Sequence, residues 1–132
     1  MEPSCQSDKD IQERLFCEIY VQSEESENSF VGRICALLSG ERSGYEVETK
    51  WAVIDVLEND DYGEEFEEPG DSFLGYRYKL EFEFETEKQI SREDYITNVG
   101  SLLTQLWESG HEAVASCCFE EDLPQKGGYK MA

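Results

Sequence analysis

Apolar and polar residues alternate in three stretches of the chain, a pattern typical of strands with one buried face. Residues 15–21 place leucine, cysteine, isoleucine and valine on one side of such a strand. Residues 73–86 alternate most clearly, because tyrosine, leucine and phenylalanine are separated by arginine, lysine and glutamate. Residues 112–119 show the same pattern with alanine, cysteine and phenylalanine. We therefore expect three strands that each have one side in the core.

A fourth strand is expected over residues 45–57, which are rich in β-branched and aromatic residues. The pattern shifts near Asp55, which predicts a bulge or the end of the strand there. Residues 58–71 then contain eight acidic residues, no basic residue, two glycines and a proline. This composition is typical of a long acidic loop rather than of a helix or a strand.

Two stretches carry the spacing of amphipathic helices. In the first, Asn28 or Ser29 is the expected N-cap, and Gly40 supplies the left-handed residue just past the end. Its apolar stripe consists of Phe30, Val31, Ile34, Leu37 and Leu38. We expect this helix to pack its stripe against the sheet.

The second helix is predicted to begin at Ser91, which forms a capping box with Asp94, and to close at Gly110. Its apolar stripe consists of Tyr95, Val99, Leu102, Leu103 and Leu106. Gly100 inside this helix costs about 1 kcal/mol relative to alanine. We expect a close approach between helix and sheet to explain that glycine.

The order of these elements is β-α-β-β-α-β, which predicts an α+β fold of the ferredoxin-like kind. We expect a four-stranded antiparallel sheet with both helices on one face and the first and third strands side by side at its centre. One domain would span residues 14–123, between a flexible N-terminal segment (1–13) and a C-terminal tail (124–132). The acidic loop over 58–71 would be an insertion between the second and third strands, and long loops in compact domains are often functional.

The chain is strongly acidic, with 31 acidic and 11 basic residues among 132 and a net charge of −20. Nucleic acids and anionic membranes would repel such a chain, whereas a basic protein would be attracted. The alternative is that the acids only keep the protein soluble. With 39% hydrophobic residues, the chain has enough apolar content to fold as one domain.

No catalytic or metal-binding constellation is found in the sequence, so we expect no enzyme activity, cofactor or metal. His111 is the only histidine, and the five cysteines form no CxxC pair, which favours free thiols in a reducing compartment. His111 at a helix-to-strand turn is typical of a surface or capping residue. A weak divalent-cation site in the 58–71 loop is an alternative to a simply hydrated loop. Without a signal peptide or membrane segment in the sequence, the cytoplasm is the expected location.

The acids are concentrated in two places, the 58–71 loop and the exposed side of the third strand, where Glu81, Glu83 and Glu85 form a ladder. An acidic sheet face argues against RNA binding. We predict an anionic patch in which Tyr62 and Phe66 are aromatic anchors for a basic protein. The predicted contact residues are Asp60, Asp61, Tyr62, Glu64, Glu65, Phe66, Glu67, Glu68, Glu81 and Glu83.

A small acidic α+β chain with an acidic, aromatic loop resembles the immunity proteins of bacterial polymorphic and contact-dependent toxins. That resemblance implies direct binding and neutralisation of a basic, nuclease-type cognate toxin. The stretch 95–124, with Leu-Trp-Glu-Ser-Gly-His at 106–111 and Phe-Glu-Glu-Asp-Leu-Pro at 119–124, also looks like small uncharacterised bacterial proteins. The alternative function is a ferredoxin-like regulatory or assembly module that dimerises through a sheet face or edge. The sequence leaves both a monomer and a homodimer open.

Overall fold

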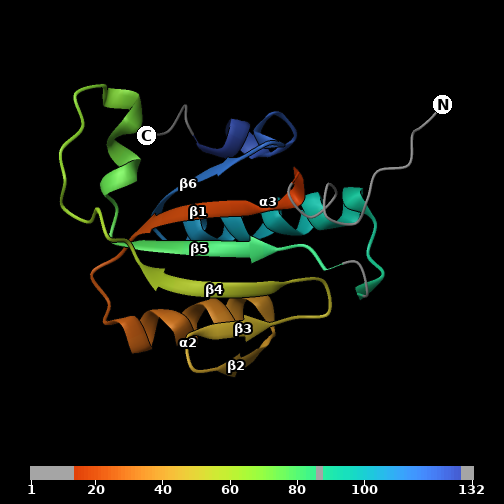
Figure 1. The fold of residues 1–132 in the computed structure, drawn as a ribbon. Helices are drawn as coiled ribbons and strands as arrows, with labels where there is room; N and C mark the ends of the chain where they lie inside the picture. The colour runs from red at the N-terminus through yellow and green to blue at the C-terminus, as the bar shows by residue number, and fades with distance from the viewer. Residues whose placement is uncertain (1–13, 86–87, 129–132) are drawn as a thin grey trace.

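The alternating stretches pair into one antiparallel sheet in the computed structural model, which describes residues 14–85 and 88–128. The strands and helices are β1 (Cys17–Gln22), α2 (Glu27–Leu38), β2 (Glu41–Ser43), β3 (Glu46–Glu48), β4 (Val53–Glu58), β5 (Tyr78–Glu83), α3 (Arg92–Glu108) and β6 (Glu112–Cys117). Three short 3-10 helices are η1 (Pro69–Gly75), η3 (Glu120–Asp122) and η4 (Pro124–Gly128). The strand order is β2-β3-β4-β5-β1-β6, and helices α2 and α3 lie behind the sheet in Figure 1. The fold is therefore α+β, as predicted.

The sheet has six strands in the described residues, so the prediction of four strands is wrong. The expected strand over 45–57 is two strands, β3 and β4, separated by a turn at Thr49. Its hydroxyl accepts from the backbone N–H of Ala52 at 2.9 Å and from that of Trp51 at 3.1 Å. The break in the pattern therefore lies at 49–52, while Asp55 is an ordinary member of β4.

Strand β2 was not predicted because its three residues are all exposed and show no apolar alternation. It pairs with β3 through a tight turn in which Gly44 has a φ of +62°. A positive φ is readily adopted by glycine and rarely by other residues. The β2–β3 hairpin therefore adds the two outermost strands to one side of the sheet.

Helix α2 begins earlier than predicted, because its N-cap is Ser26 and not Asn28 or Ser29. The Ser26 hydroxyl accepts the Ser29 N–H at 3.2 Å. The left-handed residue at its end is Ser39, with a φ of +52°, and not Gly40. A Cβ on Gly40 would lie 2.6 Å from Val47 Cγ1, so this glycine is needed for packing against β3.

Helix α3 confirms its predicted N-cap, since the Ser91 hydroxyl accepts the Asp94 N–H at 3.0 Å. Gly110 follows the helix with a φ of +91°, as expected for a closing glycine. The predicted explanation for Gly100, a close approach between the helix and the sheet, is wrong. Its backbone approaches Pro124, where an added Cβ would lie 2.9 Å from the proline Cδ. The close approach is thus to the C-terminal segment and not to the sheet.

The strand predicted over 73–86 is shorter in the structure, because β5 spans Tyr78–Glu83. Residues 73–75 belong to η1, which begins at Pro69 inside the predicted 58–71 loop. Phe73 of η1 is 3% exposed and packs edge-on against Tyr20 with ring centroids 5.3 Å apart. Phe73 is therefore a buried aromatic residue outside β5, and it made the alternation in the sequence look longer than the strand.

The main core lies between the sheet and the two helices. The Phe30 ring of α2 stacks on the Tyr78 ring of β5 with centroids 4.3 Å apart. Other fully buried members of this core are Ile19, Ile34, Ile54, Leu80, Phe82, Leu102, Leu103 and Leu106. The opposite side of the sheet, here called the open face, carries a smaller buried apolar cluster of Tyr20, Phe73 and Val114, against which Leu74 and Tyr76 pack.

Part of the predicted C-terminal tail is packed on the domain. Pro124 lies against Gly100, and Gly128 is buried beside Ala113 and Trp107. The predicted flexible segment 1–13 and residues 129–132 lie outside the described residues. Within residues 14–85 and 88–128, no helix has both the length and the apolar character that a membrane span needs.

Candidate functional site

Four carboxylates stand side by side across the open face of the sheet. Glu46 of β3 lies directly opposite Asp55 of β4. Asp55 in turn lies opposite Glu81 of β5, which lies opposite Glu18 of β1. All four are half-buried, and their strand neighbours Val47, Ile54, Leu80 and Ile19 face the core. We call Glu46, Asp55, Glu81 and Glu18 the acidic row.

The predicted ladder on the third strand is placed only in part as expected. Glu81 and Glu83 lie on β5 and face away from the helices, since Leu80 and Phe82 are fully buried. Glu85 lies beyond the strand, and its carboxylate is 3.8 Å from the Lys88 ammonium. The acids therefore extend mainly across the strands and not along one of them.

Lys79 lies between two members of the acidic row. Its ammonium lies 3.4 Å from a Glu18 oxygen and 3.5 Å from a Glu81 oxygen. Partial burial raises the pKa of Glu81, Lys79 lowers it and the neighbouring Glu18 raises it again, with a net increase. Burial lowers the pKa of Lys79, but the charge of Glu18 and its other neighbours leaves it raised. One ammonium group thus offsets only part of the repulsion in the row.

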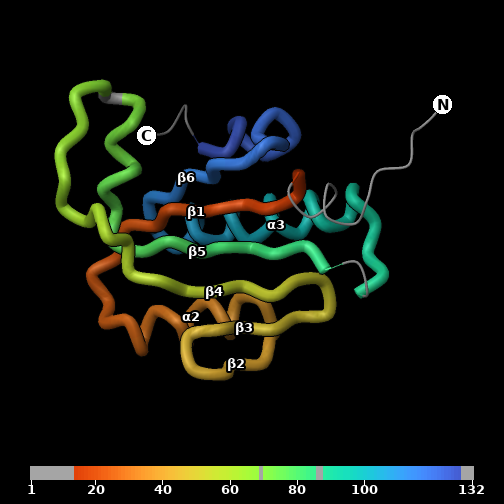
Figure 2. Tube along the Cα trace, in the orientation of Figure 1, coloured from red at the N-terminus to blue at the C-terminus, as the bar shows by residue number. Residues whose placement is uncertain are grey.

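The connection from β4 to β5 spans residues 59–77, contains most of the acidic loop and folds out at one end of the sheet (Figure 2). Asn59 at its base is 7% exposed, and its side-chain amide donates to Leu74 O at 2.7 Å and Tyr76 O at 2.8 Å. The Asn59 side-chain oxygen also accepts the Asp61 N–H at 3.2 Å. Gly63 N–H donates to Gly75 O at 3.1 Å. These bonds hold the two arms of the loop together.

The predicted contact residues of the acidic loop are mostly exposed. Tyr62 is 53% exposed, and the Arg77 guanidinium lies 5.9 Å from its ring centroid. Phe66 is half-buried, so of the two predicted anchors Tyr62 is the more accessible. The exposed acids among these contact residues are Asp60, Asp61, Glu64, Glu65, Glu67 and Glu68.

Tyr20 lies between the acidic row and the acidic loop. Burial and the charge of Glu18 raise the pKa of its hydroxyl, Lys79 lowers it, and Asp61 and Glu81 raise it further. Acids from the row and from the loop therefore act on the same hydroxyl group. We call the row together with the exposed acids of the loop the acidic surface.

A pocket of about 590 Å³ at the same end of the sheet gathers groups that the sequence did not place together. The Arg33 guanidinium donates to both oxygens of Glu25, at 2.7 and 3.1 Å. That bond lowers the pKa of Glu25 against the opposing effect of burial. His111 Nε2 lies 3.5 Å from Glu25 Oε1, and Ser109 Oγ lies 2.9 Å from His111 Nδ1. Glu25 and His111 are too far apart in the chain for this contact to be predicted.

Ser109, His111 and Glu25 are linked in the same order as the serine, histidine and acid of a hydrolytic triad. The hydrogen bonds around them, however, are those of a helix end. The Ser109 hydroxyl donates to Leu106 O at 2.9 Å. The backbone N–H groups of Ser109, Gly110 and His111 all donate to carbonyls at the end of α3. An oxyanion would find none of these three donors free. These bonds cap α3, while the His111 side chain, only 12% exposed, lies against Glu25 and not on the open surface.

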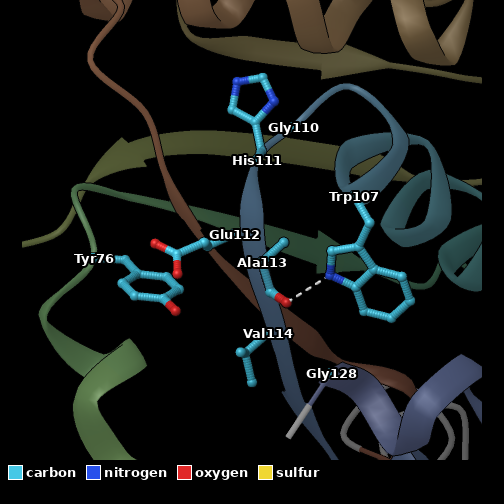
Figure 3. A pocket seen from close by; sticks show the side chains of 8 residues that line it. All are labelled: Tyr76, Trp107, Gly110, His111, Glu112, Ala113, Val114 and Gly128. Atoms are coloured by element: carbon cyan, nitrogen blue, oxygen red, sulfur yellow. Dashed lines mark hydrogen bonds between the residues drawn. The ribbon is translucent and has the colours of Figure 1, made fainter. Parts of the chain in front are cut away.

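A second pocket, of about 180 Å³, lies along the edge of β6 (Figure 3). The Trp107 indole donates to Ala113 O at 2.9 Å on one side of the strand, and Tyr76 lies beside Glu112 on the other. Burial and the charge of Glu112 raise the pKa of the Tyr76 hydroxyl. The Ala113 carbonyl at this sheet edge is thus already hydrogen-bonded to the Trp107 indole.

In the part of the chain that the structure describes, histidine, cysteine, aspartate and glutamate side chains form no group of three suited to a metal ion. The predicted contact acids of the loop are exposed. Compared with protein-family models, curated proteins and solved structures, the chain matches no family model, no curated protein and no solved structure. Its function therefore has to be argued from the acidic surface itself.

Proposed function

We propose that this protein binds a basic protein partner through the acidic surface, as an inhibitory binding protein of the toxin-immunity kind. The observation that carries the proposal is the acidic row, in which each carboxylate lies directly opposite the next across four strands. Like charges opposite one another destabilise a sheet by tenths of a kcal/mol to about 1 kcal/mol per pair. Basic groups of a partner would relieve that repulsion on binding.

The acidic loop supports the same proposal. Its exposed acids would steer a basic partner toward the surface and raise the association rate. Tyr62 offers an exposed ring of the kind that contributes strongly at interface centres. Because the bonds of Asn59 already order the loop, little conformational entropy would be lost on binding.

The arrangement of the strands supports a ferredoxin-like core. We propose that β4, β5, β1 and β6 form it, and that the β2–β3 hairpin is an addition at the β4 side. In this core β1 and β5, the first and third of the predicted strands, are paired at the centre. Four free cysteines in the described residues favour a reducing compartment, and we propose the cytoplasm.

The competing function, assembly by dimerisation, receives less support. Two copies stacked on their open faces would bring two acidic rows together. The β6 edge is occupied by the Trp107 indole and by the Glu120 carboxylate, which accepts the Cys117 N–H at 2.9 Å. Strand β2 at the other edge is three residues long and exposed, which limits edge-to-edge pairing.

The proposal is tested by titrating the protein into purified basic nuclease domains of bacterial toxins, beginning with one encoded beside its gene. We expect a one-to-one complex and inhibition of the nuclease. The double variant Glu18→Gln, Asp55→Asn should bind at least tenfold more weakly and with a smaller dependence on salt. The matched control is Glu93→Gln, Glu108→Gln, which removes the same charge from exposed positions of α3. Equal affinities of the two variants would place the interface elsewhere.

A further inference from the structure

Two cysteines far apart in the sequence are direct neighbours in the sheet. Cys17 is the first residue of β1 and Cys117 the last of β6, and the two lie opposite each other in the β1–β6 pair. Cys17 is fully buried and Cys117 half-buried, and both pack against the core between sheet and helices. Figure 1 shows β1 and β6 running side by side.

The hydrogen bonds around Cys117 identify the kind of strand pair. Its backbone N–H donates to the Glu120 carboxylate at 2.9 Å and therefore points away from β1. Ala113, which has the same parity along β6, likewise directs its carbonyl to the Trp107 indole. Cys17 and Cys117 thus form a non-hydrogen-bonded pair, in which the Cα atoms are roughly 4.5 Å apart. Disulfides need Cα separations of about 4.4–6.8 Å.

The two thiols lie close enough to affect each other's ionisation. The neighbouring Cys17 thiol lowers the pKa of Cys117, and the Phe119 N–H lowers it further. The neighbouring Cys117 thiol, together with burial, raises the pKa of Cys17. Burial and the Glu120 charge oppose the ionisation of Cys117 without reversing the direction of its shift. Cys117 is half-buried whereas Cys17 is fully buried, so a peroxide reaches the Cys117 sulfur first, and the thiolate is the nucleophile.

We propose that Cys17 and Cys117 form a reversible cross-strand disulfide when the protein meets a hydroperoxide. The Cys117 thiolate attacks one peroxide oxygen, the O–O bond breaks, and a sulfenic acid and hydroxide form. The Cys17 thiol then attacks the Cys117 sulfur, the S–O bond breaks, and a disulfide and water form. The two thiols lose two electrons in total, and these reduce one hydrogen peroxide to two waters.

The remaining described cysteines are placed differently. The Cys35 thiol donates to Gly40 O at 3.1 Å at the end of α2. Cys118 is exposed and follows the strand. The disulfide would link β1 to β6 and so close a loop of the chain from residue 17 to residue 117.

The test uses the full chain with Cys5, Cys35 and Cys118 replaced by serine, so that only the proposed pair remains. A small excess of hydrogen peroxide should lower the intact mass by two hydrogens and yield one linked peptide pair containing residues 17 and 117. Dithiothreitol should restore the mass. The oxidised form should melt several degrees higher than the reduced form, because the link restricts the unfolded chain.

Three outcomes decide against the proposal. Stepwise addition of oxygen to Cys117 without a link would show that the thiols do not meet. In the wild-type chain, a Cys117–Cys118 link or a dimer through Cys118 as the main product would also overturn it. Cys117→Ser, checked for folding by circular dichroism, should lose the intramolecular link, whereas Cys35→Ser and Cys118→Ser should keep it.

Discussion

The two faces of the sheet differ in almost every property. The helix-facing side is continuous and apolar, and Ile19, Leu80 and Phe82 are completely buried there. The open face, built by the intervening residues of the same strands, carries the acidic row. Burying a side chain such as leucine stabilises the fold by about 1.5–3 kcal/mol. One such residue therefore offsets several unfavourable pairs of acids, so a strong core leaves the other face free for binding.

The largest expected effect comes from the helix-facing side. Leu80→Ala removes a fully buried side chain between β1 and β4, next to Ile19 and Val56. We expect a loss of about 2–5 kcal/mol in the free energy of unfolding, because a cavity is left behind. Urea denaturation followed by circular dichroism measures it. Glu83→Ala, on the open side of the same strand, should stay within about 0.5 kcal/mol. Similar losses for both would remove the contrast between the faces.

An intermediate effect is expected where the acidic loop leaves the sheet. Asn59→Ala leaves the carbonyls of Leu74 and Tyr76 without their side-chain donor and should cost about 1–3 kcal/mol. The loss should be local, so amide hydrogen exchange at Asp61 and Gly63 should accelerate more than in the core strands. Asp60→Ala, an exposed change in the same loop, is the control. Unchanged exchange at Gly63 would show that Asn59 does not order the loop.

The smallest expected effect has the opposite sign. Glu81→Gln should stabilise the protein at neutral pH by tenths of a kcal/mol to about 1 kcal/mol, since it removes the centre of the acidic row. The folded-state pKa of Glu81 is raised above its ordinary value of 4.5, so the stability linked to its protonated form is lost as the pH rises through that folded value. The advantage of the variant should therefore disappear as the pH falls below 4.5.

The dependence on salt provides a second test of the stability difference between Glu81→Gln and wild type. Added salt screens repulsion between exposed or half-exposed charges, so the difference between Glu81→Gln and wild type should shrink at 1 M salt. Thermal melts at low and high ionic strength measure this change. A destabilised Glu81→Gln variant at neutral pH would mean that the bond to Lys79 outweighs the repulsion from Glu18 and Asp55.

Most of the secondary structure could be predicted because the apolar periodicity is strong. The alternation over β5 and the N-cap of α3 at Ser91 were predicted correctly from local sequence. The turn at Thr49 was missed because a side-chain hydroxyl, and not a glycine or proline, breaks the strand. Strand β2 has no apolar side and so gave no signal.

Only part of the candidate site could be predicted from the sequence. Glu81 and the acids of the loop were identified from composition and alternation. Glu46 and Asp55 were missed as members of the acidic row, because cross-strand register depends on pairing between distant segments. The contact between Glu25 and His111 was missed for the same reason. The alternation of inward and outward side chains can be read from the sequence of one strand. The register between two paired strands cannot.

The contact between Gly100 and Pro124 has a consequence for related sequences. An alanine at position 100 would place its Cβ 2.9 Å from the proline ring, so the two positions cannot vary independently. Among homologues we expect residues larger than glycine at position 100 only where position 124 or the path of the following chain has also changed. Such covariation would mark chains in which the C-terminal segment docks on α3 in this way.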